Sequence, residues 1–212
     1  MPPLTIVLTA LVLGVAAVVL SGWMRKVAAE ESWWLGIGLH VLLAGFGGAG
    51  AAALARNELE LVAFGGLALA LALLAVIDLA TFRLPDVITG PTYLFFYGAL
   101  VAAAATTDGW GQLGRAAAGG AVLLVVYFVL AFINPAGLGL GDVKLAGILG
   151  GFLGWFGWLH VLSGTLAAFL LSGLVAIVLL VTRRATLKTE FPFGPWMIAG
   201  AGVGVLWAGG PT

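Results

Sequence analysis

Two aspartates, Asp78 and Asp142, stand at the ends of long apolar segments in a chain with few charges. Asp78 follows an apolar run in LALLAVIDLATFRLPD, and Asp142 precedes one in NPAGLGLGDVKLAG. Ionisable groups at membrane depth are costly and are candidates for function by default. Two carboxyl groups brought together can share one proton, because neighbouring like charges cannot both ionise. One could then activate a water and the other could protonate a scissile carbonyl, which is the chemistry of peptide-bond hydrolysis.

The segment before Asp142 carries glycine at positions 137, 139 and 141. Glycine permits backbone conformations closed to other residues, and it allows another chain to approach closely. A glycine-rich approach to a carboxylate therefore suggests an extended substrate lying against it. A phosphate-binding loop is the rival interpretation, but the GxxxxGK[ST] pattern is absent.

Each acid also has a purely structural interpretation. Asp78 could mark the membrane interface or pair with Arg83, and Asp142 could cap the helix that follows it. Asp86 follows Pro85 and precedes an apolar segment, so we expect it to be a helix N-cap whose oxygen accepts from free backbone N–H groups.

The chain offers little for other chemistry. It has no cysteine and only two histidines, His40 and His160. Cysteine nucleophiles and thiolate metal sites are therefore excluded, a histidine-rich metal site is not expected, and no serine stands in a GxSxG elbow. We expect no metal and no cofactor.

Composition sets the environment of these acids. The chain has 212 residues, of which 62% are hydrophobic and 8% are charged, whereas about 25% of residues in soluble domains are charged. These values predict an all-α, polytopic membrane helix bundle. The net charge of zero gives no indication of nucleic-acid binding.

A membrane-spanning helix needs about 20 mostly apolar residues. This rule predicts about eight transmembrane helices in a single membrane-embedded domain, residues 1–212. The sixth and seventh nearly merge, so seven is the alternative count. The expected spans are roughly 4–22, 33–55, 59–79, 87–105, 115–133, 143–159, 161–182 and 192–208.

Basic residues predict the orientation, because cytoplasmic loops are enriched in Lys and Arg. With the N-terminus outside, Arg56 and Arg115 lie outside, and both Asp78 and Asp142 lie near the cytoplasmic face. The expected cytoplasmic basic residues are Arg25, Lys26, Arg83, Lys144, Arg183, Arg184 and Lys188.

Two further patterns concern helix ends and helix packing. Asp142 should lie at a helix N-terminus, whose dipole favours negative charge, and Asp78 at a helix C-terminal end. We therefore expect Asp142 to ionise more readily and Asp78 to hold the shared proton. Glycines four apart should let helices approach closely; these pairs are Gly147/Gly151, Gly150/Gly154 and Gly200/Gly204.

The motifs resemble a known family. Gly139-Leu140-Gly141-Asp142 matches the GxGD signature of intramembrane aspartyl proteases. IDLATFRLPDVIT (77–89) and GLGLGDVKLAGILGGFLGW (137–155) resemble the two aspartate segments of type IV prepilin peptidases. FPFGPWMIAGA (191–201) resembles their C-terminal PFGP element.

The resemblance implies an aspartic endopeptidase with Asp78 and Asp142 as its catalytic pair. Such enzymes cleave short basic leaders from prepilins, pseudopilins or Tad-type precursors, after a glycine and on the cytoplasmic side of the inner membrane. The large members carry a cytoplasmic domain with CxxC pairs and also methylate the new N-terminus. Residues 23–32 occupy that place here, so the resemblance is to a short form without methyltransferase activity.

The same resemblance supplies further candidates that would bind substrate or shape the site. Substrates and the lipid bilayer are the expected partners, and the sequence does not predict an oligomeric state. A small ion-coupled transporter is the alternative function, because intramembrane carboxylates and glycine-broken helices also mark ion sites. The candidate site-shaping residues are Gly137, Gly139, Gly141, Lys144, Asp86, Pro192 and Gly194.

Overall fold

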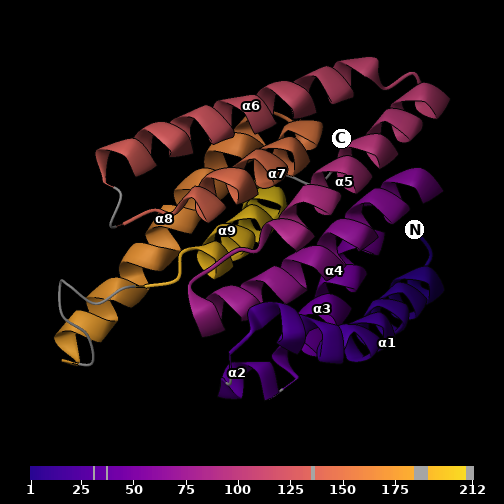
Figure 1. Ribbon diagram of the computed structural model, residues 1–212. Helices are drawn as coiled ribbons and strands as arrows, with labels where there is room; N and C mark the ends of the chain where they lie inside the picture. The colour runs from indigo at the N-terminus through magenta and orange to yellow at the C-terminus, as the bar shows by residue number, and fades with distance from the viewer. Residues whose placement is uncertain (31, 37, 135–136, 184–190, 209–212) are drawn as a thin grey trace. The chain divides into compact units, whose positions relative to one another are not determined.

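The computed structural model describes residues 1–30, 32–36, 38–134, 137–183 and 191–208. Every regular element within these ranges is a helix (Figure 1). The chain is therefore an all-α polytopic membrane bundle, as its composition predicts. The helices are α1 (Pro3–Ala28), α2 (Trp33–Gly36), α3 (Leu39–Leu54), α4 (Glu58–Thr81), α5 (Asp86–Thr107), α6 (Trp110–Ile133), α7 (Leu140–Phe156), α8 (Trp158–Val181) and α9 (Gly194–Trp207).

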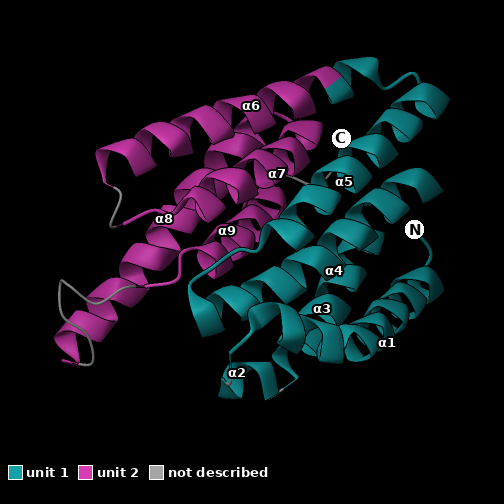
Figure 2. Ribbon diagram, in the orientation of Figure 1, with its two compact units in different colours: residues 1–113 teal, residues 114–212 magenta. Residues whose placement is uncertain are grey.

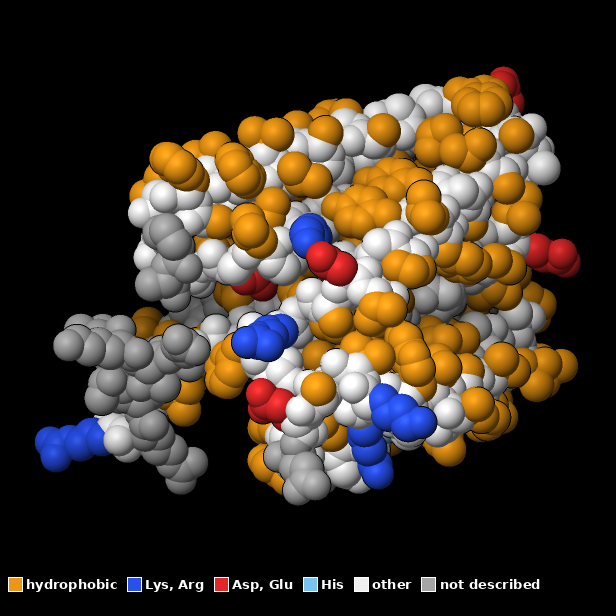
Figure 3. Space-filling model, viewed as in Figure 1, with side chains coloured by type: hydrophobic (Ala, Val, Ile, Leu, Met, Phe, Trp, Pro, Cys, Tyr) orange, Lys and Arg blue, Asp and Glu red, His pale blue; other side chains and the backbone are white. Residues whose placement is uncertain are grey.

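Five of these helices, α1, α4, α5, α6 and α8, are long and apolar enough to cross a membrane. The helices at the other three expected spans are shorter: α3 has 16 residues, α7 has 17 and α9 has 14. Hydrophobic side chains cover much of the surface visible in Figure 3. The exposed hydrophobic residues of the chain include Leu11, Val15 and Val19 of α1, as expected for a face toward lipid.

Two expected spans differ from the structure at glycines. The span predicted over 33–55 is interrupted at Gly38, whose φ of 71° lies in the left-handed region that favours glycine. It therefore forms the single turn α2 and the helix α3. Gly157, with a φ of 152°, separates α7 from α8, so the sixth and seventh expected spans are distinct helices.

The chain forms two compact units, residues 1–113 and 114–212 (Figure 2). In unit 1, α3 packs between α1 and α4, and α4 also packs on α5. Small side chains at Ala17, Ala44 and Ala72 form a buried cluster that joins α1, α3 and α4. The Ser21 Oγ and His40 Nε2 atoms, 2.7 Å apart, add a polar link between α1 and α3. These contacts hold α4, the helix that carries Asp78.

In unit 2, glycines lie at the closest helix approaches. A Cβ on Gly150 would stand 2.5 Å from the Gly119 carbonyl oxygen, so α7 and α6 touch backbone to backbone. A Cβ on Gly204 would stand 2.5 Å from the Gly164 Cα, which brings α9 equally close to α8. Gly154 and Gly200 make similar contacts, confirming the packing role predicted for the Gly150/Gly154 and Gly200/Gly204 pairs.

Candidate active site

Asp78 lies near the C-terminal end of α4, as predicted. The helix begins at an N-cap, Asn57, whose side chain accepts from the Glu60 N–H at 2.8 Å. It ends where the Phe82 N–H donates to the Asp78 carbonyl at 2.9 Å, with Phe82 in the left-handed conformation. The Asp78 side chain is only 4% exposed. The helix thus holds the buried Asp78 side chain one turn from its C-terminal end.

The capping role predicted for Asp86 is wrong. Pro85 is the N-cap of α5 and makes no side-chain cap hydrogen bond, and Asp86 is the first helical residue. Proline fixes φ near −65° and suits the residue at a helix start, so the helix begins one residue earlier than expected. The exposed Asp86 carboxylate still lies in the first turn, where the helix dipole favours negative charge.

Asp142 lies in the first turn of α7, which confirms its predicted place at a helix N-terminus. Its Oδ2 accepts a hydrogen bond from the Gly139 N–H at 2.9 Å. The Gly139 carbonyl in turn accepts from the Asp142 N–H at 3.1 Å. One carboxylate oxygen therefore stabilises the helix end and fixes the orientation of the acid.

The glycines before Asp142 do not adopt the conformations that only glycine favours. Among the described glycines, positive φ values occur at Gly38 and Gly157, and Gly139 has a φ of −85° and a ψ of 161°. A Cβ added to Gly139 would meet its nearest neighbour, Asp142 Oδ2, at 3.7 Å, an ordinary contact. Backbone strain is therefore not the reason for glycine at position 139, and the predicted close approach of a second chain stays a prediction.

The other predicted site residues lie in unit 2. Lys144 is exposed on α7, and Gly194 is the buried first residue of α9, with Pro192 two positions before it. The structure thus places two groups of candidates in two units. Asp78 and Asp86 belong to unit 1; Gly137, Gly139, Gly141, Asp142, Lys144, Pro192 and Gly194 belong to unit 2.

Sequence reasoning missed an aromatic cluster in unit 2. The Tyr127 ring lies 5.8 Å from the Phe169 ring and 6.2 Å from the Phe193 ring, between centroids. The Phe169 and Phe193 rings are 5.3 Å apart. Phe193 is the aromatic residue of the PFGP segment and the N-cap of α9. The available signal was helical spacing, because Tyr127 lies four residues after Leu123 on the buried face of α6.

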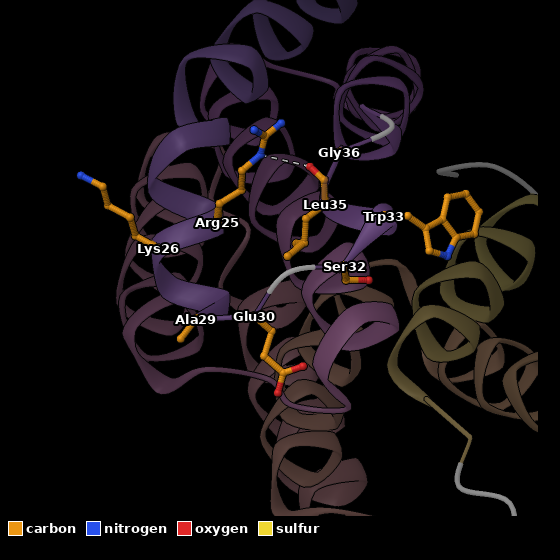
Figure 4. Close-up of a pocket in the computed structure, with 8 residues that line it drawn as sticks. All are labelled: Arg25, Lys26, Ala29, Glu30, Ser32, Trp33, Leu35 and Gly36. Atoms are coloured by element: carbon orange, nitrogen blue, oxygen red, sulfur yellow. Dashed lines mark hydrogen bonds between the residues drawn. The ribbon is translucent and has the colours of Figure 1, made fainter.

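A pocket of about 680 Å³ lies in unit 1 after the end of α1 (Figure 4). The Arg25 Nε donates to the Leu35 carbonyl at 3.3 Å, which ties the end of α1 to α2. None of the predicted catalytic or site-shaping residues lines this pocket, so it is separate from the candidate active site. Its lining residues are Arg25, Lys26, Ala29, Glu30, Ser32, Trp33, Leu35 and Gly36.

Metal ligands do not gather in the part of the chain that the structure describes. No group of three or more His, Cys, Asp or Glu side chains there could hold a metal ion.

Comparison with known families bears on this site. The model of the type IV leader peptidase family matches residues 65–181, more than half of the chain, and this segment contains both Asp78 and Asp142. The chain belongs to the type IV leader peptidase family. This leader peptidase homologue is also a multi-pass membrane protein, given its five span-length apolar helices.

Curated relatives carry the name prepilin leader peptidase/N-methyltransferase. One from Burkholderia pseudomallei (strain 1026b) is 34% identical over 175 residues, which cover 77% of this chain and 52% of the relative. One from Pseudomonas putida is 33% identical over 103 residues, covering 46% of this chain and 35% of the relative. One from Aeromonas hydrophila is 32% identical over 139 residues, covering 63% and 45%. The chain thus spans about half the length of these relatives or less. No solved structure matches it.

Proposed function

We propose that this leader peptidase homologue is an intramembrane aspartyl endopeptidase that removes the short basic leader of prepilin-like precursors. The observation that carries the proposal is the family match over residues 65–181, which contains both Asp78 and Asp142. Asp78 is buried one turn before the end of α4, and Asp142 lies in the first turn of α7. The substrates would be pilins, pseudopilins or Tad-type precursors, cut after a glycine.

The proposed mechanism brings Asp78 and Asp142 together around one shared proton. The ionised acid removes a proton from water, and the hydroxide attacks the scissile carbonyl carbon while the other acid protonates its oxygen. The tetrahedral intermediate then collapses, the C–N bond breaks, and a proton passes to the leaving amine. One water is consumed, and the products are a leader carboxylate and a new amino terminus.

The two acids have unequal roles in this proposal. We assign Asp142 as the base. Burial raises the pKa of its carboxyl group, which strengthens it as a proton acceptor, and the Gly139 N–H at the helix N-terminus opposes this by favouring the charged form. Asp78 holds the shared proton, because its buried position at a helix C-terminal end disfavours the charged form. The pair titrates as a unit, so the assignment concerns the resting state of the pair.

The substrate is proposed to reach Asp142 in an extended conformation past Gly139. A helical peptide bond is shielded by its own hydrogen bonds, so the cut site must unwind. Gly139 is exposed, and neither strain nor internal packing requires it to be glycine. Its missing side chain would let the substrate backbone lie beside the carboxylate.

We place the reaction at the cytoplasmic face of the inner membrane, with the N-terminus outside. The support is the bias of basic residues toward the ends of helices that would be cytoplasmic in this orientation. We expect cleavage without N-methylation, because residues 23–32 stand where the large members carry their additional domain and the chain has no cysteine.

The positions of the acids favour this function over ion-coupled transport. A transporter site is expected near the middle of the membrane, on discontinuous helices. Asp78 and Asp142 instead lie within a turn of the ends of α4 and α7, where a leader outside the membrane could reach them.

The test is co-expression with a candidate prepilin of wild type, Asp78→Asn and Asp142→Asn. Wild type should shorten the precursor, with mass spectrometry placing the cut after a glycine, and both variants should leave it intact. Unchanged cleavage by either variant would rule out the two-aspartate mechanism. Transport of an ion without any cleavage would favour the alternative function.

A further inference from the structure

Helices α6 and α7 run antiparallel, and their register can be read from two backbone contacts. A Cβ on Gly119 would stand 2.6 Å from the Gly150 carbonyl oxygen, and a Cβ on Gly154 would stand 2.6 Å from the Arg115 carbonyl oxygen. Four residues forward along α6 therefore correspond to four residues back along α7, about 6 Å in each helix.

The same register continues toward the start of α7. The next pair is Leu123 with Ala146, and both residues line one small cavity in unit 2. The pair after that is Tyr127 with Asp142. Tyr127 on α6 and Asp142 on α7 therefore lie opposite each other along the helix pair, about two turns from the contact between Gly119 and Gly150.

The surroundings of Tyr127 hold it in place. Its side chain is 2% exposed, and its ring is in contact with Phe169 of α8 and Phe193 at the start of α9. Neither phenylalanine has a polar atom, so the cluster fixes the ring without binding the hydroxyl.

We propose that Tyr127 is a positioning residue for Asp142, because Phe169 and Phe193 hold its ring and the register of α6 and α7 places it opposite the carboxyl group. The inference rests on the proposed function, in which Asp142 takes part in hydrolysis. Gly139 N–H already holds Oδ2 of Asp142 from its own helix. In this proposal the Tyr127 hydroxyl is a second donor to Asp142, from α6, and the Tyr127 ring also packs on Phe193 of the PFGP segment.

The hydroxyl can be removed without removing the ring. Tyr127→Phe in the purified full chain should lower kcat roughly 10- to 100-fold, as expected for a lost hydrogen bond to a charged group, with KM changed less than about twofold. The unfolding temperature should stay at the wild-type value. Tyr97→Phe, the matched change in unit 1, should keep wild-type kcat. A wild-type kcat in Tyr127→Phe, or an equal loss in Tyr97→Phe, would overturn the proposal.

The register can be tested without any activity measurement, because the chain has no cysteine. A Tyr127→Cys/Asp142→Cys variant should be joined by a short bifunctional thiol reagent. A Tyr127→Cys/Lys144→Cys variant should not, because Lys144 lies on the other side of α7. Absence of cross-linking in the first variant overturns the register. A third outcome separates the two claims. If the first variant is cross-linked but the wild-type protein cleaves no precursor, the register of α6 and α7 is right, and both the proposed function and the positioning role of Tyr127 are wrong.

Discussion

The carboxylate of Asp142 accepts a hydrogen bond from the backbone N–H of Gly139 at 2.9 Å. The candidate base is therefore also a structural part of the helix that presents it. Substitutions of Asp142 can therefore separate its catalytic role from its structural role. The amide of an asparagine can still accept the Gly139 hydrogen bond, but it cannot accept a proton from water.

The first prediction follows from this separation. Asp142→Asn should keep the stability of the chain and lose cleavage by roughly 10²- to 10⁴-fold, the usual contribution of a general base. Asp142→Ala should lose cleavage equally and also destabilise the chain by about 1 kcal/mol, as for other lost helix caps. Thermal unfolding in detergent, beside the cleavage assay, measures both. Equal destabilisation by the two variants would show that the cap hydrogen bond is not what holds this helix end.

Two glycines of unit 2 should respond in opposite ways to alanine. Gly139→Ala should fold normally, because its Cβ meets only Asp142 Oδ2 at 3.7 Å, and should lower kcat/KM roughly 10- to 100-fold by obstructing the substrate. Gly150→Ala should destabilise the chain by about 1–3 kcal/mol, because its Cβ would stand 2.5 Å from the Gly119 carbonyl oxygen. The unfolding temperature and the cleavage rate of each variant decide. Full activity in Gly139→Ala would show that substrate does not pass there.

The orientation can be checked with single cysteines in this cysteine-free chain. Ala29→Cys, beside Arg25 and Lys26, should resist a membrane-impermeant maleimide applied to cells with an intact inner membrane. Gly109→Cys, between α5 and α6, should react, because its loop is expected outside. Both should react after the membrane is permeabilised. The reverse labelling pattern would place the active site on the outer face.

Much of the fold could be predicted from the sequence because hydropathy changes sharply at the helix ends. The run before Asp78 and the run after Asp142 placed both acids near helix termini, and the structure confirms this for α4 and α7. The break at Gly38 was missed, because a glycine in an apolar segment that is rich in glycine gives no distinct signal. Asp86 was placed one residue too early, because a proline can occupy the cap position itself.

The aromatic cluster shows what sequence reasoning lacks. Tyr127 sits in an apolar stretch of α6 and looks like an ordinary buried ring. Its level opposite Asp142 depends on the register of two helices, which is set by the contacts of Gly119 and Gly154. Patterns of single residues predict which glycines permit close packing, but not which partner each one meets.

The central claim is that Asp78 and Asp142 act as one unit. The most direct measurement is the initial cleavage rate of purified wild type, Asp78→Asn, Asp142→Asn and the double variant on one prepilin substrate, with Asp108→Asn as the control for an exposed acid. Residues that act as a unit are not additive in their effects on rate. Each single variant should therefore lose as much activity as the double variant, with Asp108→Asn at the wild-type rate. Substantial activity in either single variant, or a double-variant loss equal to the product of two partial losses, would contradict the account.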